Sequence, residues 1–147
     1  VSRLTKTLVA VTKTDTTNER GLRTLQDGDL SLLNSFEFNL NGKLGTTLFA
    51  PFTNAFDRVS GDATVNLDAF SPTVRIAAPT GATHFKVVMG ASADTAAIAL
   101  TASLTANSTL PVVQVLGVEF YQEVNGQMYE LKNGAYNALA VVIVDTP

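Results

Sequence analysis

The chain has 147 residues, of which 46% are hydrophobic and 16% are charged, and its formal net charge at pH 7 is −3. This length is typical of one compact domain and the apolar content is enough for a core, so neither a two-domain enzyme nor an intrinsically disordered chain is expected. The weakly acidic balance disfavours nucleic-acid binding, which needs clustered Lys and Arg. Without cysteine, the sequence offers no disulfide, no thiolate nucleophile and no cysteine-based metal site.

The first 34 residues are predicted to be a helical segment. Within 1–14, apolar residues recur at helical spacing, namely Leu4, Leu8 and Val11. Thr16 and Glu19 form a capping-box pattern, which predicts a second short helix that ends at Gly28. Such short helices are marginal alone in water, so we expect segment 1–34 to dock on the following domain or on a neighbouring subunit. Because the sequence starts at Val1 rather than Met, we expect a mature chain or a part of a longer product.

From residue 35 the hydrophobic periodicity changes to two, which predicts an antiparallel β-sandwich over 35–147, of the immunoglobulin or fibronectin-III type. Alternation at 36–40 followed by Asn41-Gly42 predicts a first hairpin. The other candidate strands are 63–70, 73–77, 84–91, 98–104, 112–124, 127–132 and 138–144. The near-continuous apolar run 138–144 favours a central strand that is covered on both faces, and it is far too short for the roughly 20 residues of a membrane helix.

Segment 117–132 makes the most specific prediction, because Asn125-Gly126 is a two-residue turn signal between two alternating strands. With those two residues at the turn, Glu119 should lie beside Lys132. One face of the hairpin is then apolar and should be buried, and it consists of Val118, Phe120, Val124, Tyr129 and Leu131.

The opposite face of that hairpin is a possible interaction surface, made of Glu119, Tyr121, Glu123, Met128 and Glu130. Tyr and Met are enriched in interfaces, which supports this interpretation. A paired-carboxylate glycosidase site is the competing hypothesis, but nothing in the sequence indicates the burial that would raise a carboxyl pKa there. We therefore expect a solvated or partner-binding face rather than an active site.

No catalytic residue, cofactor-binding residue or metal ligand is predicted. The single histidine, His84, lies on an alternating strand opposite in direction to Phe85 and Val87, and a catalytic role would require a carboxylate within hydrogen-bond reach in a pocket. No phosphate-binding glycine loop is present. Asp27-Gly28-Asp29 has too few oxygen donors for calcium, and a helix stop followed by an N-cap explains it better.

Five of the ten basic residues fall in the first 23 positions, namely Arg3, Lys6, Lys13, Arg20 and Arg23. They would steer this segment towards an acidic partner, or they are solvated helix faces, which is the favoured interpretation.

Three segments carry a resemblance to known proteins, and together they make up about a third of the chain: GDLSLLNSFEFN, APTGATHFKVV and LGVEFYQEVNGQMYELKNGAYNALAVVIVD. They resemble conserved hypothetical proteins of Bacteroidota. The resemblance implies a bacterial source and a short N-terminal part joined to a β-rich C-terminal domain, and it brings no activity or site residues.

Low charge density and the lack of recognisable catalytic groups favour a non-enzymatic structural or assembly protein, such as a subunit of a bacterial surface, filament or particle. The expected partner is a second copy or another protein, through an interface above roughly 1,000 Å² that involves the N-terminal segment. The alternative is a β-sandwich module that binds a protein or glycan, with tyrosines supplying stacking rings. An extracellular or cell-surface location is expected, and the sequence identifies no small-molecule ligand.

Overall fold

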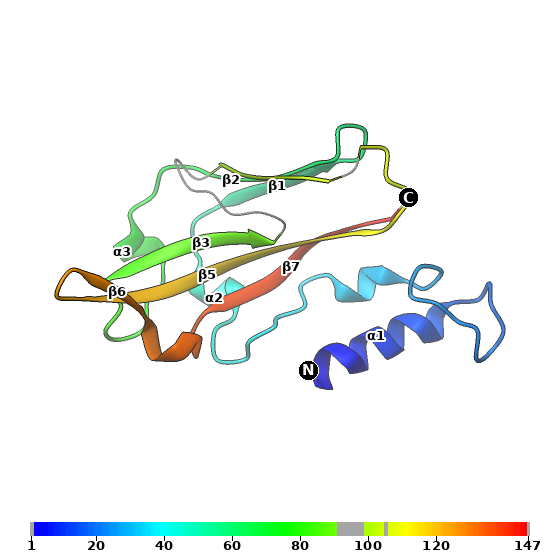
Figure 1. Cartoon of the computed structure of the whole chain (residues 1–147), viewed down its shortest axis with the longest axis horizontal. Helices are drawn as coiled ribbons and strands as arrows, with labels where there is room; N and C mark the ends of the chain where they lie inside the picture. The colour runs from blue at the N-terminus through cyan, green and yellow to red at the C-terminus, as the bar shows by residue number, and fades with distance from the viewer. Residues whose placement is uncertain (1, 91–98, 105, 147) are drawn as a thin grey trace.

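The computed structural model describes residues 2–90, 99–104 and 106–146, and it shows a mainly β chain with two antiparallel sheets and one N-terminal helix (Figure 1). The first sheet has the strand order β1-β2-β4, with bounds Phe52–Asp57, Asp62–Leu67 and Ala99–Ser103. In the second sheet the long strand β5 (Val112–Val124) pairs with β3 (His84–Gly90), and β6 (Gln127–Glu130) and β7 (Ala138–Asp145) pair with its two ends.

The two sheets pack face to face around one hydrophobic core. Both contribute buried residues to a common cluster, which includes Ala63, Val65, Leu100, Ala102, Val87, Met89, Leu116, Val118, Phe120, Ala138 and Ala140. At one end the Arg58 guanidinium joins the sheets, because it pairs with Asp145 of β7 and donates to the Ser108 carbonyl at 2.6 Å. The amide of Asn54 on β1 makes a second link by donating to the Val142 carbonyl at 2.9 Å.

The predicted N-terminal helix is confirmed as α1 (Ser2–Thr14). Its apolar stripe packs on the short 3₁₀ helix η1 (Leu30–Leu33) and on Val144, with Val11 fully buried between them. In Figure 1, α1 and η1 lie on the side of the second sheet that faces away from the first sheet. The helix therefore docks on its own chain. Among the described residues, no helix has the length and apolar character needed to cross a membrane.

The predicted second helix after Thr16 is wrong, and a loop organised by a buried carboxylate takes its place. The Asp15 side chain accepts backbone N–H groups from Thr17, Asn18 and Thr24, and it also accepts the Asn18 amide at 2.9 Å. These bonds satisfy N–H groups that a helix would otherwise use, and Gly21 adopts a φ of 103°, which a helix does not allow. The N-cap expected after Gly28 is confirmed, because the Asp29 carboxylate caps η1 by accepting Ser31 N–H.

The hydrogen bond from Asn18, together with the backbone N–H bonds, holds the Asp15 pKa at about 2, below its ordinary 3.8, against the opposing effect of burial. A lowered native pKa means that this stabilisation is present above pH 3.8 and is lost as the pH falls towards 2. We expect Asp15→Asn to lower the thermal midpoint at pH 6, and we expect the gap from wild type to close as the pH approaches 2. Circular dichroism melts across this pH range test both points, and a gap that is constant with pH would contradict them.

Most predicted strands from residue 63 onwards are confirmed, with boundaries that differ by a few residues at their ends. The predicted secondary structure is wrong in two segments. The stretch 73–77 contains the helical turn α3 (Pro72–Arg75) instead, which follows Ser71 and begins with proline, a residue suited to a helix start. The expected hairpin at 36–42 is an extended segment followed by the helical turn α2 (Leu44–Thr47). A Cβ on Gly42 would lie 2.4 Å from the Tyr136 carbonyl oxygen, so this glycine permits a close approach of two backbones.

Strand β7 was expected to be central, but it is an edge strand that pairs only with β5 among the named strands. Its other edge is covered by the extended segment 35–38, since Ser35 and Phe38 donate N–H groups to the carbonyls of Val141 and Leu139. This cover explains the apolar sequence of β7, because it leaves Ala140 and Val141 buried on opposite faces.

Candidate functional site

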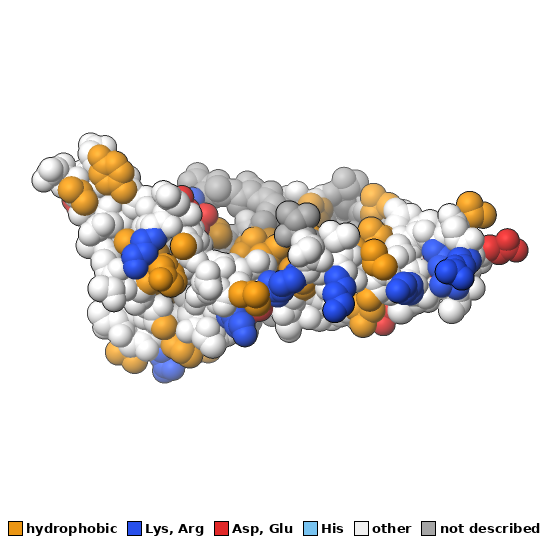
Figure 2. All heavy atoms as spheres, turned by 90° about the horizontal axis from the view of Figure 1, so that it is seen from below, with side chains coloured by type: hydrophobic (Ala, Val, Ile, Leu, Met, Phe, Trp, Pro, Cys, Tyr) orange, Lys and Arg blue, Asp and Glu red, His pale blue; other side chains and the backbone are white. Residues whose placement is uncertain are grey.

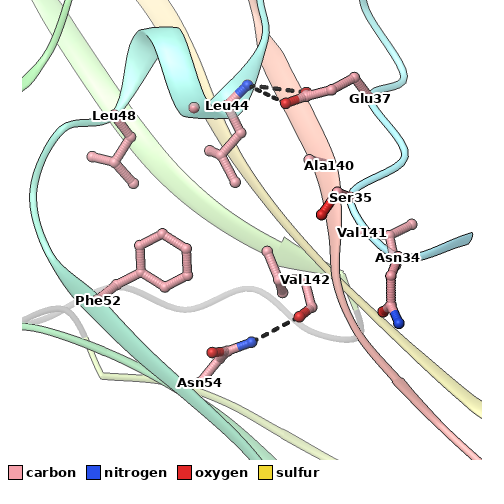
Figure 3. A pocket seen from close by; sticks show the side chains of 11 residues that line it. Asn34, Ser35, Glu37, Leu44, Leu48, Phe52, Asn54, Ala140, Val141 and Val142 are labelled. Carbon is pink, nitrogen blue, oxygen red and sulfur yellow. Dashed lines mark hydrogen bonds between the residues drawn. The ribbon is translucent and has the colours of Figure 1, made fainter. Parts of the chain in front are cut away.

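A cleft lies between the sheets, beside the edge of β1 (Figure 3). Its volume is about 510 Å³, and its walls come from segment 34–37, α2, β1 and β7. The apolar lining residues are Leu44, Leu48, Phe52, Ala140, Val141 and Val142. Leu44, Leu48, Ala140 and Val141 are buried in its walls, whereas Phe52 and Val142 are half-buried.

Two polar side chains hold the walls of this cleft in place. Both carboxylate oxygens of Glu37 accept the Leu44 N–H at 3.0 Å, which satisfies the first backbone donor of α2. Asn54 bridges the opening from β1 to the Val142 carbonyl. Figure 3 shows the Glu37 carboxylate turned to the start of α2 and the Asn54 amide turned to β7. Both groups are occupied with structural bonds.

The edge of β1 that borders this cleft is unpaired within the described part of the chain. Gly61 N–H donates to the Asp57 carbonyl at 2.8 Å, which turns the polar backbone groups of Asp57 towards β2. Backbone groups alternate in direction along an antiparallel strand, so those of Phe52, Asn54 and Phe56 face the free edge. No described backbone group outside the β1–β2 ladder bonds to them.

The residues of the predicted hairpin surface lie on the face of the second sheet that points away from the first sheet. The Asn125-Gly126 turn is confirmed, both residues having positive φ, and the pairs Tyr121 with Glu130 and Glu123 with Met128 have the expected register. Glu123, Met128 and Glu130 are exposed, whereas Glu119 and Tyr121 are half-buried.

The prediction is wrong at the end of the hairpin that lies away from the turn. Strand β6 stops at Glu130 and the chain turns into η2 (Leu131–Gly134), where Lys132 has a left-handed φ of 49°. Lys132 therefore lies over the Tyr136 ring, and the residue opposite Glu119 is Lys86 of β3. On the other face Phe120 and Leu131 are buried as predicted, but Val124 and Tyr129 are 45% and 58% exposed.

A hydrogen bond fixes the centre of this surface. The Tyr121 hydroxyl donates to Glu119 Oε2 at 2.7 Å, and Tyr121 lies opposite His84 on one side and Glu130 on the other. The bond to Glu119 is the main reason why the Tyr121 pKa rises to about 12, with smaller contributions from burial and from the charges of Glu119 and Glu130. The tyrosine is thus held neutral, as a hydrogen-bond donor.

We expect Tyr121 to be the phenol whose ionisation is observed near pH 12. As the pH rises from 10 to 12, the unfolded chain loses this proton while the folded chain retains it, so folding stability should fall in that range. Titration of the tyrosinate absorbance should lose its step near pH 12 in Tyr121→Phe. The matched variant Tyr129→Phe should keep that step, and its disappearance there instead would contradict the assignment.

His84 lies at the rim of a second cleft of about 350 Å³, which is walled by Ile76, Phe85 and Phe120 among others. Its Nδ1 is bonded to the Thr83 hydroxyl at 2.9 Å, and its Nε2 is 3.9 Å from Glu123 Oε2. That distance exceeds a hydrogen bond, so the carboxylate contact that catalysis would require is not formed. Within the described residues, no three His, Asp or Glu side chains are grouped to hold a metal ion.

The basic residues of the first 23 positions are all exposed. Viewed from below in Figure 2, Lys and Arg side chains form a row under the part of the molecule that carries α1. Two of these residues have local contacts, because Arg3 lies 5.2 Å from the centre of the Phe36 ring and Arg23 donates to the Lys13 carbonyl. We interpret this row as solvated basic side chains that lie beside the apolar face of α1.

Sequence reasoning missed the open cleft and the β1 edge altogether. The signal was present as the alternation of Phe52, Asn54 and Phe56 with exposed residues. Comparison with known proteins adds no assignment. No family model, curated protein or solved structure matches the chain.

Proposed function

We propose that this chain is a non-enzymatic structural subunit that associates with other copies in a bacterial surface, filament or particle assembly. The observation that carries the proposal is the edge of β1. Six residues there, FTNAFD, have no lysine, no proline and no charge before the final Asp57. An open edge with unpaired N–H and C=O groups is a template for pairing with another strand.

Two other sheet edges, those of β3 and β7, are protected, which distinguishes β1 from them. Strand β3 has Lys86 at its centre, a common device against edge pairing. Strand β7 is covered by segment 35–38. The neighbourhood of β4 includes residues outside the described ranges, so the comparison concerns β1, β3 and β7. Of these three edges, β1 alone has neither a charge before its last residue nor cover beside it.

The strand order supports the finer proposal that the fold is of the immunoglobulin or fibronectin-III type. Such sandwiches place strands A, B and E in one sheet and C, F and G in the other. Here β1, β2 and β4 take the places of A, B and E, and β3, β5 and β7 take those of C, F and G. In this assignment β1 is strand A at the edge of its sheet, and β6 with η2 is an interruption before strand G.

The solution mass tests the proposed function. A monomer has a mass of 15.5 kDa, and we expect light scattering to give a mass at least twice as large that rises with protein concentration. A mass of 15.5 kDa from micromolar to near-millimolar concentration, without a co-purifying protein, would contradict the proposal.

A binding module for a protein or glycan is the second candidate, and one observation favours it. The hairpin of β5 and β6 extends beyond the last pair with β3 and exposes Met128 on one face and Tyr129 on the other. Exposed aromatic and Met side chains are typical of contact surfaces. A monomeric chain that binds a glycan or protein, and loses this binding in Tyr129→Ser, would favour the module over the subunit.

A further inference from the structure

We propose that β1 pairs antiparallel with β1 of a second copy about a two-fold axis that passes through Asn54. This inference rests on the proposed function and names its partner surface and register. It joins the two three-stranded sheets into one six-stranded sheet. Closed two-fold pairing of identical surfaces is the commonest way in which soluble chains associate.

The backbone geometry permits this axis. The N–H and C=O groups of Phe52, Asn54 and Phe56 all face the free edge. Two antiparallel copies centred on Asn54 place its outward groups against those of its own copy, where the two residues exchange both hydrogen bonds. Phe52 and Phe56 then repeat the arrangement on either side of the axis. Each outward group of the strand gains a partner.

The side chains favour this register over its neighbours. With the axis at Asn54, position numbers of opposite residues sum to 108, so Phe52 lies opposite Phe56 of the second copy, and this pair occurs twice. Thr53 lies opposite Ala55, and the charged Asp57 lies opposite Pro51, so no like charges meet. A shift of one pair, with the axis at Thr53 or Ala55, sets Asn54 opposite a phenylalanine and loses both aromatic pairs.

The cleft gives this pairing an additional gain in buried surface. Phe52 and Asn54 line the cleft on the inner face of β1, where Phe52 packs against the core. A strand added at this edge extends the first sheet over the mouth of the cleft and brings the Phe56 ring of the second copy beside it. Apolar surface that water now reaches would be covered.

Disulfide trapping tests the register, because the chain has no cysteine of its own. In the proposed pair Thr53 and Ala55 of the second copy are directly opposite, at about 4.5 Å between Cα atoms, which suits a disulfide. Two copies of Thr53 are instead about 8 Å apart, too far for one. We therefore expect a mixture of Thr53→Cys and Ala55→Cys proteins, distinguished by a size tag, to oxidise mainly to the mixed dimer.

Asn66→Cys is the matched control, since Asn66 is exposed on the same sheet opposite Thr53 within one chain, but on the interior strand β2. It should link to neither protein. Equal amounts of the mixed dimer and both like dimers, or equal linking by Asn66→Cys, would overturn the register.

A second pair of variants tests the backbone: Asn54→Pro removes an outward N–H, whereas Asn54→Ala removes only the side chain. We expect at least a tenfold weaker association for Asn54→Pro than for Asn54→Ala, with both variants still folded by circular dichroism.

The outcomes separate this inference from the proposed function. If the wild type is oligomeric but the mixed dimer does not form, self-pairing of β1 is wrong and the subunit proposal stands. If the wild type is monomeric throughout and no disulfide forms, both are wrong. If the mixed dimer forms and Asn54→Pro dissociates, the register and the partner are established together.

Discussion

Phe120→Ala should lower the free energy of unfolding by about 3–5 kcal/mol, the range for removing a large buried aromatic side chain. Phe120 is 1% exposed and is the largest fully buried side chain of the core. It lies opposite Phe85 in the β3–β5 ladder, at the back of the cleft that His84 borders. Since a domain of this size is stable by about 5–15 kcal/mol in total, this loss would bring the chain close to unfolding.

Urea unfolding followed by far-ultraviolet circular dichroism measures the effect, because the chain has no tryptophan to serve as a fluorescence probe. Val124→Ala is the matched control on the same strand, since its side chain is 45% exposed, and we expect it to cost less than about 0.5 kcal/mol. Similar midpoint shifts for the two variants would show that Phe120 does not anchor the core.

The strand β5 shows what the sequence could predict. Its bounds, its turn and the inward direction of Phe120 follow from local signals, namely a turn that needs two positive φ angles and an alternation of period two. Such signals depend only on neighbouring residues. The register near the turn was therefore correct, and the apolar residues nearest the sheet were buried.

The errors arise where burial depends on distant parts of the chain. Val124 and Tyr129 alternate correctly with polar residues, but β3 ends opposite Tyr121 and no layer covers the hairpin beyond that point. Lys132 leaves the strand because the chain must turn into β7, a requirement that the alternation does not contain. Periodicity predicts which face is apolar, and only the tertiary arrangement decides how far along the strand that face is covered.

The candidate site was missed for the same reason. Strand β1 has a polar residue, Asn54, on its inner face between two phenylalanines, and this weakens the apolar alternation. The Asn54 amide is accommodated there by the Val142 carbonyl, 88 positions away in the sequence. An edge strand is defined by the absence of a neighbour in the sheet, so the sequence of 52–57 alone could indicate a strand but not its free edge.

Gly117→Ala should be the second strongly destabilising substitution, through lack of space rather than backbone strain. Gly117 lies in the middle of β5, between β3 and β7. A Cβ there would be 2.5 Å from the Ala138 carbonyl oxygen, 3.0 Å from Leu139 Cδ1 and 3.1 Å from Val88 Cγ2. The two side chains can rotate, but the carbonyl oxygen moves only if β7 moves away from β5.

Overpacking of this kind costs about 1–3 kcal/mol, and we expect the upper part of that range because the nearest atom belongs to the backbone. Gly45→Ala is the matched control: a Cβ at Gly45 meets nothing within 4 Å, and alanine favours the helical turn α2, so its midpoint should stay the same or rise. Trimming the flexible neighbour in the double variant Gly117→Ala with Leu139→Ala should not restore stability. Recovery in that double variant would show that Leu139, and not the Ala138 carbonyl of the β5–β7 ladder, is what excludes a side chain at position 117.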